Sequence, residues 1–166
     1  EYLRTLRRLA PDANVIEVPY PNNRVELFYY SSERRSEVLH GGVPGWTWPG
    51  LAPLIGGLDA LYVNFISGFE MELETAQLLR QHFKGVTYCD LHSLLLAVAP
   101  GGLRTPRPMA NVAEWCRCFD LLQVNEDELA LMAPDAMALA ATALANGVRC
   151  LAVTLGKRGA AYFAQP

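Results

Sequence analysis

The sequence predicts an α/β fold with a mostly parallel sheet, and three observations support that prediction. From Leu58 onward, short apolar runs alternate with amphipathic segments, which is typical of parallel strands joined by covering helices. Upstream, two extended segments flank a polar stretch at residues 31–34, which indicates a protruding β-hairpin. The 166 residues are 51% hydrophobic, which suits one domain with a buried core and excludes a disordered or fibrous chain.

The amino-terminal elements follow from local spacing. Leucines recur at helical intervals in residues 1–10, which predicts the tail of a helix that feeds a strand at 14–18. The hairpin strands are expected at 24–31 and 35–39, closed by Gly41-Gly42. The segment 43–57 is rich in proline and glycine, so it is expected to be irregular or briefly helical.

The second half of the chain supplies the core. Apolar runs predict strands at 60–66, 86–91, 121–124 and 150–155. Amphipathic patterns between them predict helices at 71–83, 111–118, 126–132 and 135–145. Each of these strands after the first therefore arrives by a crossover, and residues 159–163 are expected to return antiparallel after a tight Gly-Lys-Arg-Gly turn.

Composition and charge argue against several classes of partner. The net charge is −3 with no basic stripe, so nucleic acid is not expected to bind. No apolar run approaches the ~20 residues that cross a bilayer, and no signal peptide opens the chain, so we expect a cytoplasmic chain without membrane contact. The cysteines lack the paired spacing of a zinc site and are expected to pack in the core: Cys89, Cys116, Cys118 and Cys150.

Polar residues follow the predicted core strands, where open α/β sheets bind ligands. Asn125 opens a helix and Glu128 follows three residues later, which fits a capping box. The same pair also suits a phosphate held by Asn and backbone amides, with magnesium held through Glu. Sequence alone favours the capping box without excluding the ligand site.

Two other strand ends carry candidate chemistry. Thr154 leads into a turn whose glycines, Gly156 and Gly159, allow a ligand to approach the backbone, while Lys157 and Arg158 could neutralise phosphate. An ordinary hairpin turn explains the same residues. Asp90, His92 and Ser93 invite comparison with a hydrolase triad, but residues so close on one strand alternate faces, and no G-x-S-x-G elbow supports the idea.

Taken in order, these segments resemble the ribokinase (PfkB) family of carbohydrate and nucleoside kinases. Residues 120–129, Asp-Leu-Leu-Gln-Val-Asn-Glu-Asp-Glu-Leu, are similar to the family's strand followed by N-x-x-E. Residues 147–160 resemble its strand leading into a T-L-G-x-x-G nucleotide turn. Residues 63–70 and 88–93 fit the preceding strands, and the hairpin would be the family's β-lid. The resemblance implies a three-layer α/β fold, with residues 24–44 as lid and 58–166 as core.

The resemblance also implies roles for individual residues. Asn125 would contact nucleotide phosphates, Glu128 would organise Mg²⁺ and its waters, and the turn residues Thr154, Gly156, Lys157 and Gly159 would line the ATP site. Asp90 would be a supporting acid, and Asn64 is a weaker candidate for contact with the sugar. The lid would be a candidate interface for a homodimer.

Two family segments have no counterpart within residues 1–166. These are the amino-terminal substrate strands with their paired glycines, and the G-A-G-D segment whose Asp deprotonates the acceptor hydroxyl. The resemblance is therefore to the middle of a kinase, without the catalytic base, and the chain alone is not expected to turn over. The parent protein would transfer the ATP γ-phosphoryl group to a hydroxyl of a small sugar or nucleoside.

Two alternatives stay open. The chain could be a non-catalytic α/β module that binds a nucleotide or a protein, using the Trp46/Trp48 loop and an unpaired sheet edge as contact surface. A small flavodoxin-like binder fits less well, because its phosphate loop should follow the first strand.

Overall fold

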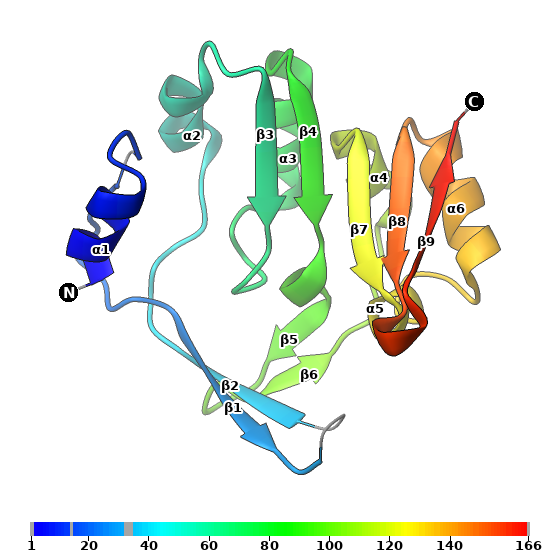
Figure 1. The fold of residues 1–166 in the computed structure, drawn as a ribbon, viewed down its shortest axis with the longest axis horizontal. Coiled ribbons are helices and arrows are strands. Elements are labelled where there is room, and N and C mark those ends of the chain that lie inside the picture. The colour runs from blue at the N-terminus through cyan, green and yellow to red at the C-terminus, as the bar shows by residue number, and fades with distance from the viewer. Residues whose placement is uncertain (1, 14, 32–34, 166) are drawn as a thin grey trace.

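The structure is a computed structural model that describes residues 2–13, 15–31 and 35–165. Figure 1 shows a central sheet with a hairpin projecting below it. Before the core come α1 (Tyr2–Leu9), β1 (Arg24–Tyr29), β2 (Arg35–His40) and α2 (Trp48–Ile55). The core elements are β3 (Ala60–Asn64), α3 (Leu73–His82), β4 (Val86–Asp90), η1 (His92–Leu95), β5 (Leu96–Val98), β6 (Arg104–Pro106), α4 (Val112–Cys118), β7 (Leu121–Asn125), α5 (Glu126–Leu129), α6 (Ala136–Ala145), β8 (Cys150–Thr154), η2 (Gly156–Arg158) and β9 (Ala160–Ala164).

The central sheet has five strands in the order β3-β4-β7-β8-β9. The first four are parallel, and β9 returns antiparallel to β8 after the η2 turn. This confirms the predicted crossovers and the predicted antiparallel return. Because the four parallel strands run in one direction, their carboxyl ends meet at the same edge of the sheet.

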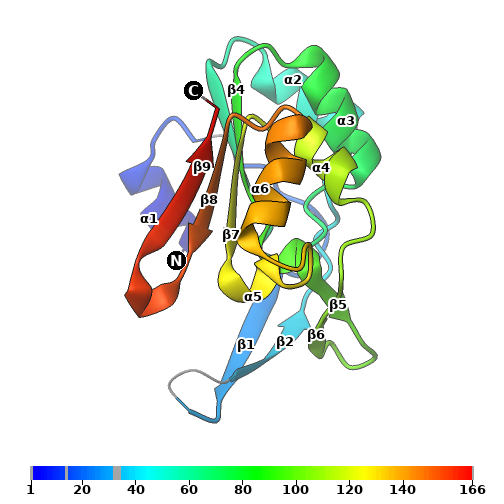
Figure 2. The same ribbon diagram turned by 90° about the vertical axis from the view of Figure 1, so that its right-hand side faces the viewer.

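Helices α2, α3, α4 and α6 lie on one side of this sheet (Figure 2). The strand residues that face them are buried and apolar, including Cys89, Leu122, Val124 and Leu151. Phe65, fully buried just after β3, packs edge-on against Trp115 of α4 with ring centroids 5.6 Å apart. Alternation along each strand therefore fixes which side chains build the core.

The opposite face of the sheet carries polar and aromatic side chains that are only partly buried. Tyr62 and Tyr88 stack across β3 and β4 with centroids 4.8 Å apart, and Tyr162 on β9 is 77% exposed. Among the described residues, α1 is the only helix on this side of the sheet (Figure 2). Its leucines Leu3, Leu6 and Leu9 are all exposed. The described part of the chain thus supplies the sheet and one helical layer of the predicted architecture.

Asp120 fixes the start of β7 against β4 and α3. One carboxylate oxygen accepts hydrogen bonds from the backbone N–H and the hydroxyl of buried Thr87, at 2.9 and 3.0 Å. The other oxygen accepts one from Arg80 at the end of α3, at 2.9 Å. Burial opposes ionisation of Asp120, but these donors outweigh it and hold its pKa below the ordinary value.

The predicted β-hairpin is present as β1 and β2, which pair antiparallel from Arg24↔His40 to Tyr29↔Arg35. Residues 32–34 at its tip lie outside the described residues. β5 and β6, each three residues long, form a second hairpin that the sequence did not predict. The two hairpins meet where the Leu39 backbone N–H donates to the Gly102 carbonyl at 2.8 Å, so the β1–β2 hairpin rests on the second hairpin.

The predicted strand at 14–18 is wrong for the residues that can be judged. Residues 15–18 form no strand, and Ile16 and Val18 are 49% and 37% exposed; Asn14 is not among the described residues. Three apolar residues, Val15, Ile16 and Val18, favoured a strand, but no strand among the described residues pairs with this segment to complete its hydrogen bonds. The segment predicted as briefly helical does contain a short helix, α2.

Candidate functional site

Four predicted site residues lie together at the carboxyl edge of the sheet. Strand pairing places Asn64 directly beside Asp90, and Asn125 directly beside Thr154. All four are partly buried and lie on the face without the α3–α4–α6 layer. The candidate for substrate contact (Asn64), the supporting acid (Asp90) and the candidates for nucleotide contact (Asn125 and Thr154) thus lie in that order on β3, β4, β7 and β8.

Asn125 and Glu128 form the predicted capping box. The Asn125 side-chain oxygen accepts from the Glu128 backbone N–H at 2.9 Å, and Glu128 Oε2 accepts from the Asn125 backbone N–H at 2.8 Å. The Asn125 amide also donates to Glu128 Oε1 at 2.6 Å. The Glu128 side chain is 10% exposed, so this carboxylate is held tightly in a largely dry setting.

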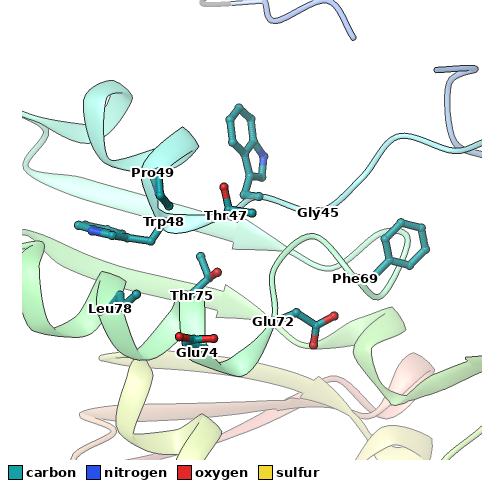
Figure 3. Close-up of a pocket in the computed structure, with 10 residues that line it drawn as sticks. Gly45, Thr47, Trp48, Pro49, Phe69, Glu72, Glu74, Thr75 and Leu78 are labelled. Carbon is teal, nitrogen blue, oxygen red and sulfur yellow. The ribbon is translucent and has the colours of Figure 1, made fainter. Parts of the chain in front are cut away.

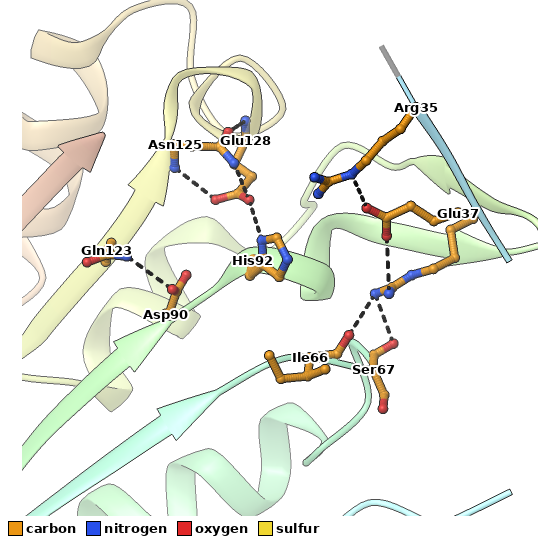
Figure 4. A network of polar contacts seen from close by, with 10 residues as sticks. Arg35, Glu37, Ile66, Ser67, Asp90, His92, Gln123, Asn125 and Glu128 are labelled. Carbon is orange, nitrogen blue, oxygen red and sulfur yellow. Dashed lines mark hydrogen bonds and ion pairs between the residues drawn. The ribbon is translucent and has the colours of Figure 1, made fainter. Parts of the chain in front are cut away.

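His92 also contacts Glu128, which the sequence did not predict. Its Nδ1 lies 3.0 Å from Glu128 Oε1 (Figure 4). This hydrogen bond raises the pKa of His92 above its ordinary value, against the opposing effect of burial. The triad comparison fails on the same geometry, because His92 is engaged with Glu128, while Ser93 is fully buried and its hydroxyl has no hydrogen-bond partner among the described residues.

Asp90 is held from β7 by a short polar chain. Tyr88 donates to the Gln123 oxygen at 2.6 Å, and the Gln123 amide donates to Asp90 at 3.0 Å. Burial raises the pKa of the Asp90 carboxyl, and the nearby negative charge of Glu128 raises it further. Two carboxylates therefore share this edge, and their mutual repulsion favours a cation there. Gln123 lies two residues before Asn125 on the same face, so strand alternation could have identified it.

The Thr154–Gly159 turn lies beside this cluster. Positive φ angles at Gly156 (+56°) and Gly159 (+92°) explain the two glycines, and a side chain at either position would meet open space. The Leu155 backbone N–H closes the turn on the Gly159 carbonyl at 2.8 Å. Arg158 pairs with Glu126 of α5, so the turn is tied to the helix that carries Glu128.

Arg104 of β6, whose side chain is 2% exposed, connects the β1–β2 hairpin to the loop after β3. Its guanidinium donates to the carbonyls of Ile66 and Ser67 at 3.1 and 3.3 Å and lies 3.4 Å from Glu37 of β2 (Figure 4). Arg35 of the same strand binds Glu37 at 2.8 Å. No feature of the sequence distinguishes Arg104 from a solvent-exposed arginine, so this contact could not have been predicted.

The Ser67–Glu70 loop is closed by its own carboxylate. Glu70 accepts from the backbone N–H of Ser67 and from that of Gly68, the latter at 2.9 Å. Asn23 donates to the Ser67 hydroxyl at 2.9 Å, which connects this loop to the chain just before β1. Asn64, at the head of the loop, has a buried side-chain oxygen without a hydrogen-bond partner among the described residues.

Two cavities flank this loop on its other side. One, of about 380 Å³, is lined by residues around the start of α2 and α3, including Trp46, Trp48, Phe69 and Glu72 (Figure 3). The other, of about 570 Å³, is lined by Met71, Met109, Trp115 and Arg107 among others. Neither is lined by Asn125, Glu128 or the 154–159 turn, so the polar edge is separate from these two cavities.

The donor set at Glu128 fits magnesium. Each carboxylate oxygen offers two lone pairs; Oε1 accepts two hydrogen bonds and Oε2 accepts one, which leaves one site on Oε2. The described residues contain no group of three or more His, Cys, Asp or Glu side chains placed to hold a metal. A cation here would take most of its ligands from waters and phosphates, as Mg²⁺ does at phosphoryl-transfer sites.

Comparison with known proteins identifies the fold. No protein-family model matches the sequence, and neither does any curated protein sequence. Among solved structures, Thermotoga maritima ribokinase aligns with 99% of this chain and 54% of its own at a TM-score of 0.67 and 18% identity. Burkholderia thailandensis nucleoside kinase in complex with inosine aligns with 98% of this chain and 50% of its own, with a TM-score of 0.63 and 13% identity.

Arabidopsis thaliana ribokinase in complex with ribose and ATP gives a TM-score of 0.55 at 16% identity, over 89% of this chain and 46% of its own. The chain therefore has the ribokinase-like α/β fold, as the sequence predicted. It spans about half the length of the structures it matches. No helix in the described part of the chain is long and apolar enough to cross a membrane.

Proposed function

We propose that residues 1–166 supply the nucleotide-facing part of a kinase that transfers the ATP γ-phosphoryl group to a hydroxyl of a small sugar or nucleoside. The observation that carries the proposal is the placement of Asn125, Glu128 and the Thr154–Gly159 turn side by side at one edge of a ribokinase-like sheet. The ligands of the matched structures, ribose with ATP in one and inosine in another, are of the proposed classes.

In this scheme each residue has a limited task. Glu128, fixed by three hydrogen bonds, orients the cation and its waters. Asn125 has one amide N–H left for a phosphate oxygen, because the other donates to Glu128. The nucleotide lies against the turn that contains Thr154, Gly156, Lys157 and Gly159. It can approach the backbone closely because the space over both glycines is open. Magnesium, when bound, would neutralise charge on the transferred phosphoryl group.

On the acceptor side, Asp90 supports the site as a nearby carboxylate, and Asn64, which lies beside it on β3, is the weaker candidate for contact with the acceptor. The acceptor hydroxyl oxygen forms the new bond to phosphorus as the bond to the leaving ADP oxygen breaks. The hydroxyl proton passes to a base that residues 1–166 do not supply in this scheme. The lid, positioned by Arg104, would cover the acceptor and is a candidate surface for a homodimer.

Calorimetric titration of ATP into the protein that contains residues 1–166, with Mg²⁺ and with EDTA, tests the proposal. We expect Mg²⁺ to strengthen ATP binding and Glu128→Gln to weaken Mg²⁺-dependent binding by ~10–100-fold, the usual range for groups that orient a metal's ligands. Asp127→Asn is the matched control, because Asp127 is an exposed carboxylate on the same helical turn. Equal binding by wild type and Glu128→Gln would overturn the assignment of Glu128.

The alternative, a non-catalytic binding module, draws on a different observation. Trp46 is 38% exposed and lines the 380 Å³ cavity with Phe69 and Glu72, away from the polar edge. If Trp46→Ala abolished a partner's binding while ATP did not bind at all, this alternative would replace the kinase proposal.

A further inference from the structure

His92 occupies a backbone conformation that needs an explanation. Its φ is +23°, the one positive φ of a non-glycine residue in the described part of the chain. Such a conformation is strained and persists when its surroundings fix it. Here the Asp90 carboxylate accepts a hydrogen bond from the His92 backbone, and the Ser93 N–H donates to the Phe65 carbonyl at 2.9 Å.

The effect of this turn is to aim the imidazole across the sheet edge. The ring projects from the start of η1, just after β4, and meets Glu128 on α5 (Figure 4). The two residues are 36 positions apart in the sequence, so local capping does not account for the contact. With 38% of its side chain exposed, the ring is not a core packing element either.

The position of His92 decides which part of the Glu128 carboxylate stays available. His92 Nδ1 and the Asn125 amide together saturate Oε1, at 3.0 and 2.6 Å. Oε2 accepts only the Asn125 backbone N–H and keeps one lone pair. Without His92 the capping box would still hold Glu128, but Oε1 would also have a free lone pair and the carboxylate could rotate.

We propose that His92 is a positioning residue that holds Glu128 so that its Oε2 presents a single lone pair to a hydrated divalent cation. The inference rests on the proposed function, since it assigns His92 to the same site. It predicts that His92 affects cation binding specifically and not nucleotide binding in general. Groups of this kind change metal affinity by ~10–100-fold when removed.

The test uses Mn²⁺, detected by electron paramagnetic resonance, and the non-hydrolysable ATP analogue AMP-PNP, with the protein that contains residues 1–166. His92→Gly removes the ring and accepts a positive φ without strain, so it separates loss of the ring from backbone strain. His92→Asn keeps an N–H donor at the δ position, and Asn tolerates positive φ. His82→Ala is the control, because His82 stacks on Trp48 and is remote from Glu128.

We expect His92→Gly to weaken Mn²⁺ binding by ~10-fold or more while AMP-PNP binding in EDTA stays within about twofold of wild type. His92→Asn should recover most of the Mn²⁺ affinity, and His82→Ala should match wild type. Unchanged Mn²⁺ affinity in His92→Gly, or a parallel loss of Mn²⁺ and metal-free AMP-PNP binding, overturns the inference and leaves the proposed function standing. A wild-type protein that binds neither probe overturns the proposed function and the inference with it.

Nitrogen NMR of the wild-type imidazole gives a measurement that does not depend on any His92 variant folding. We expect Nδ1 to carry a proton shared with Glu128, and its resonance to move in Glu128→Gln. A bare Nδ1, with the proton on Nε2 alone, would contradict the proposed hydrogen bond.

Discussion

Replacing Arg104 with methionine should release the lid. Methionine keeps much of the apolar stem but removes the guanidinium, which donates to the Ile66 and Ser67 carbonyls and pairs with Glu37. Breaking a buried ion pair costs ~3–5 kcal/mol, because the remaining charge stays buried. Glu37, whose side chain is 13% exposed, retains Arg35 as a partner, so the lower end, about 3 kcal/mol, is expected.

Urea unfolding followed by tryptophan fluorescence measures the global part of this loss, and hydrogen exchange at residues 35–40 measures the local part. A loss of about 3 kcal/mol corresponds to a fall in Tm of ~6–12 °C for a domain of this size. Arg35→Met is the matched control: Arg35 is 42% exposed, and exposed pairs contribute ~0–1 kcal/mol. The double variant Arg104→Met/Glu37→Gln should recover only part of this loss, because the neutral side chain at position 37 no longer needs the missing guanidinium but the Ile66 and Ser67 carbonyls still lack their donor. A loss below about 1 kcal/mol in Arg104→Met, with unchanged exchange at 35–40, would refute the idea that Arg104 fastens the lid.

Three further outcomes test the frame of the site. Gly68→Ala should lower the free energy of unfolding in urea by ~2–4 kcal/mol, because a Cβ there would lie 2.2 Å from the Ser93 carbonyl oxygen. The control Gly147→Ala has a similar φ but open space around the Cβ, so it should lose only ~1 kcal/mol. Equal losses would contradict the steric argument. Asp120→Ala should lose ~2–3 kcal/mol by calorimetry, because the Thr87 N–H is left buried without its acceptor; a loss within 0.5 kcal/mol would contradict this. The pKa of Asp120 is lower in the folded state than in the unfolded state, where it is ~3.9. The contribution of Asp120 to stability is therefore present above the unfolded pKa and is lost as the pH falls through the folded pKa. Asp120→Ala should lose less stability in acid than the wild type does.

The parts of the site that rest on local chemistry could be predicted from the sequence. Asn125 and Glu128 stand three residues apart at a strand end, and the capping box depends on nothing more distant. The glycines of the Thr154–Gly159 turn likewise indicate positive φ angles. Parallel pairing then brings these segments to one edge, because apolar runs of about five residues alternate with helical ones.

The parts that depend on distant contacts could not be predicted. Arg104 lies in a strand of three residues that ends in Pro106, too short for a period-2 signal. The polar residues near His92 in the sequence, Asp90 and Ser93, do not indicate its partner Glu128, which is 36 residues away. The prediction of a strand at 14–18 was wrong for a related reason. A strand is stable only beside another strand, and no local pattern indicates whether a neighbouring strand is present.

Phosphorus NMR can test our proposal that the protein containing residues 1–166 phosphorylates a small sugar or nucleoside. The protein is incubated with ATP, Mg²⁺ and a panel of acceptors that includes ribose and inosine. We expect a new phosphomonoester signal that grows in step with ADP for at least one acceptor and falls by ~10–100-fold in Glu128→Gln but not in Asp127→Asn. A spectrum in which ATP stays intact with every acceptor, or yields only ADP and inorganic phosphate, would contradict it.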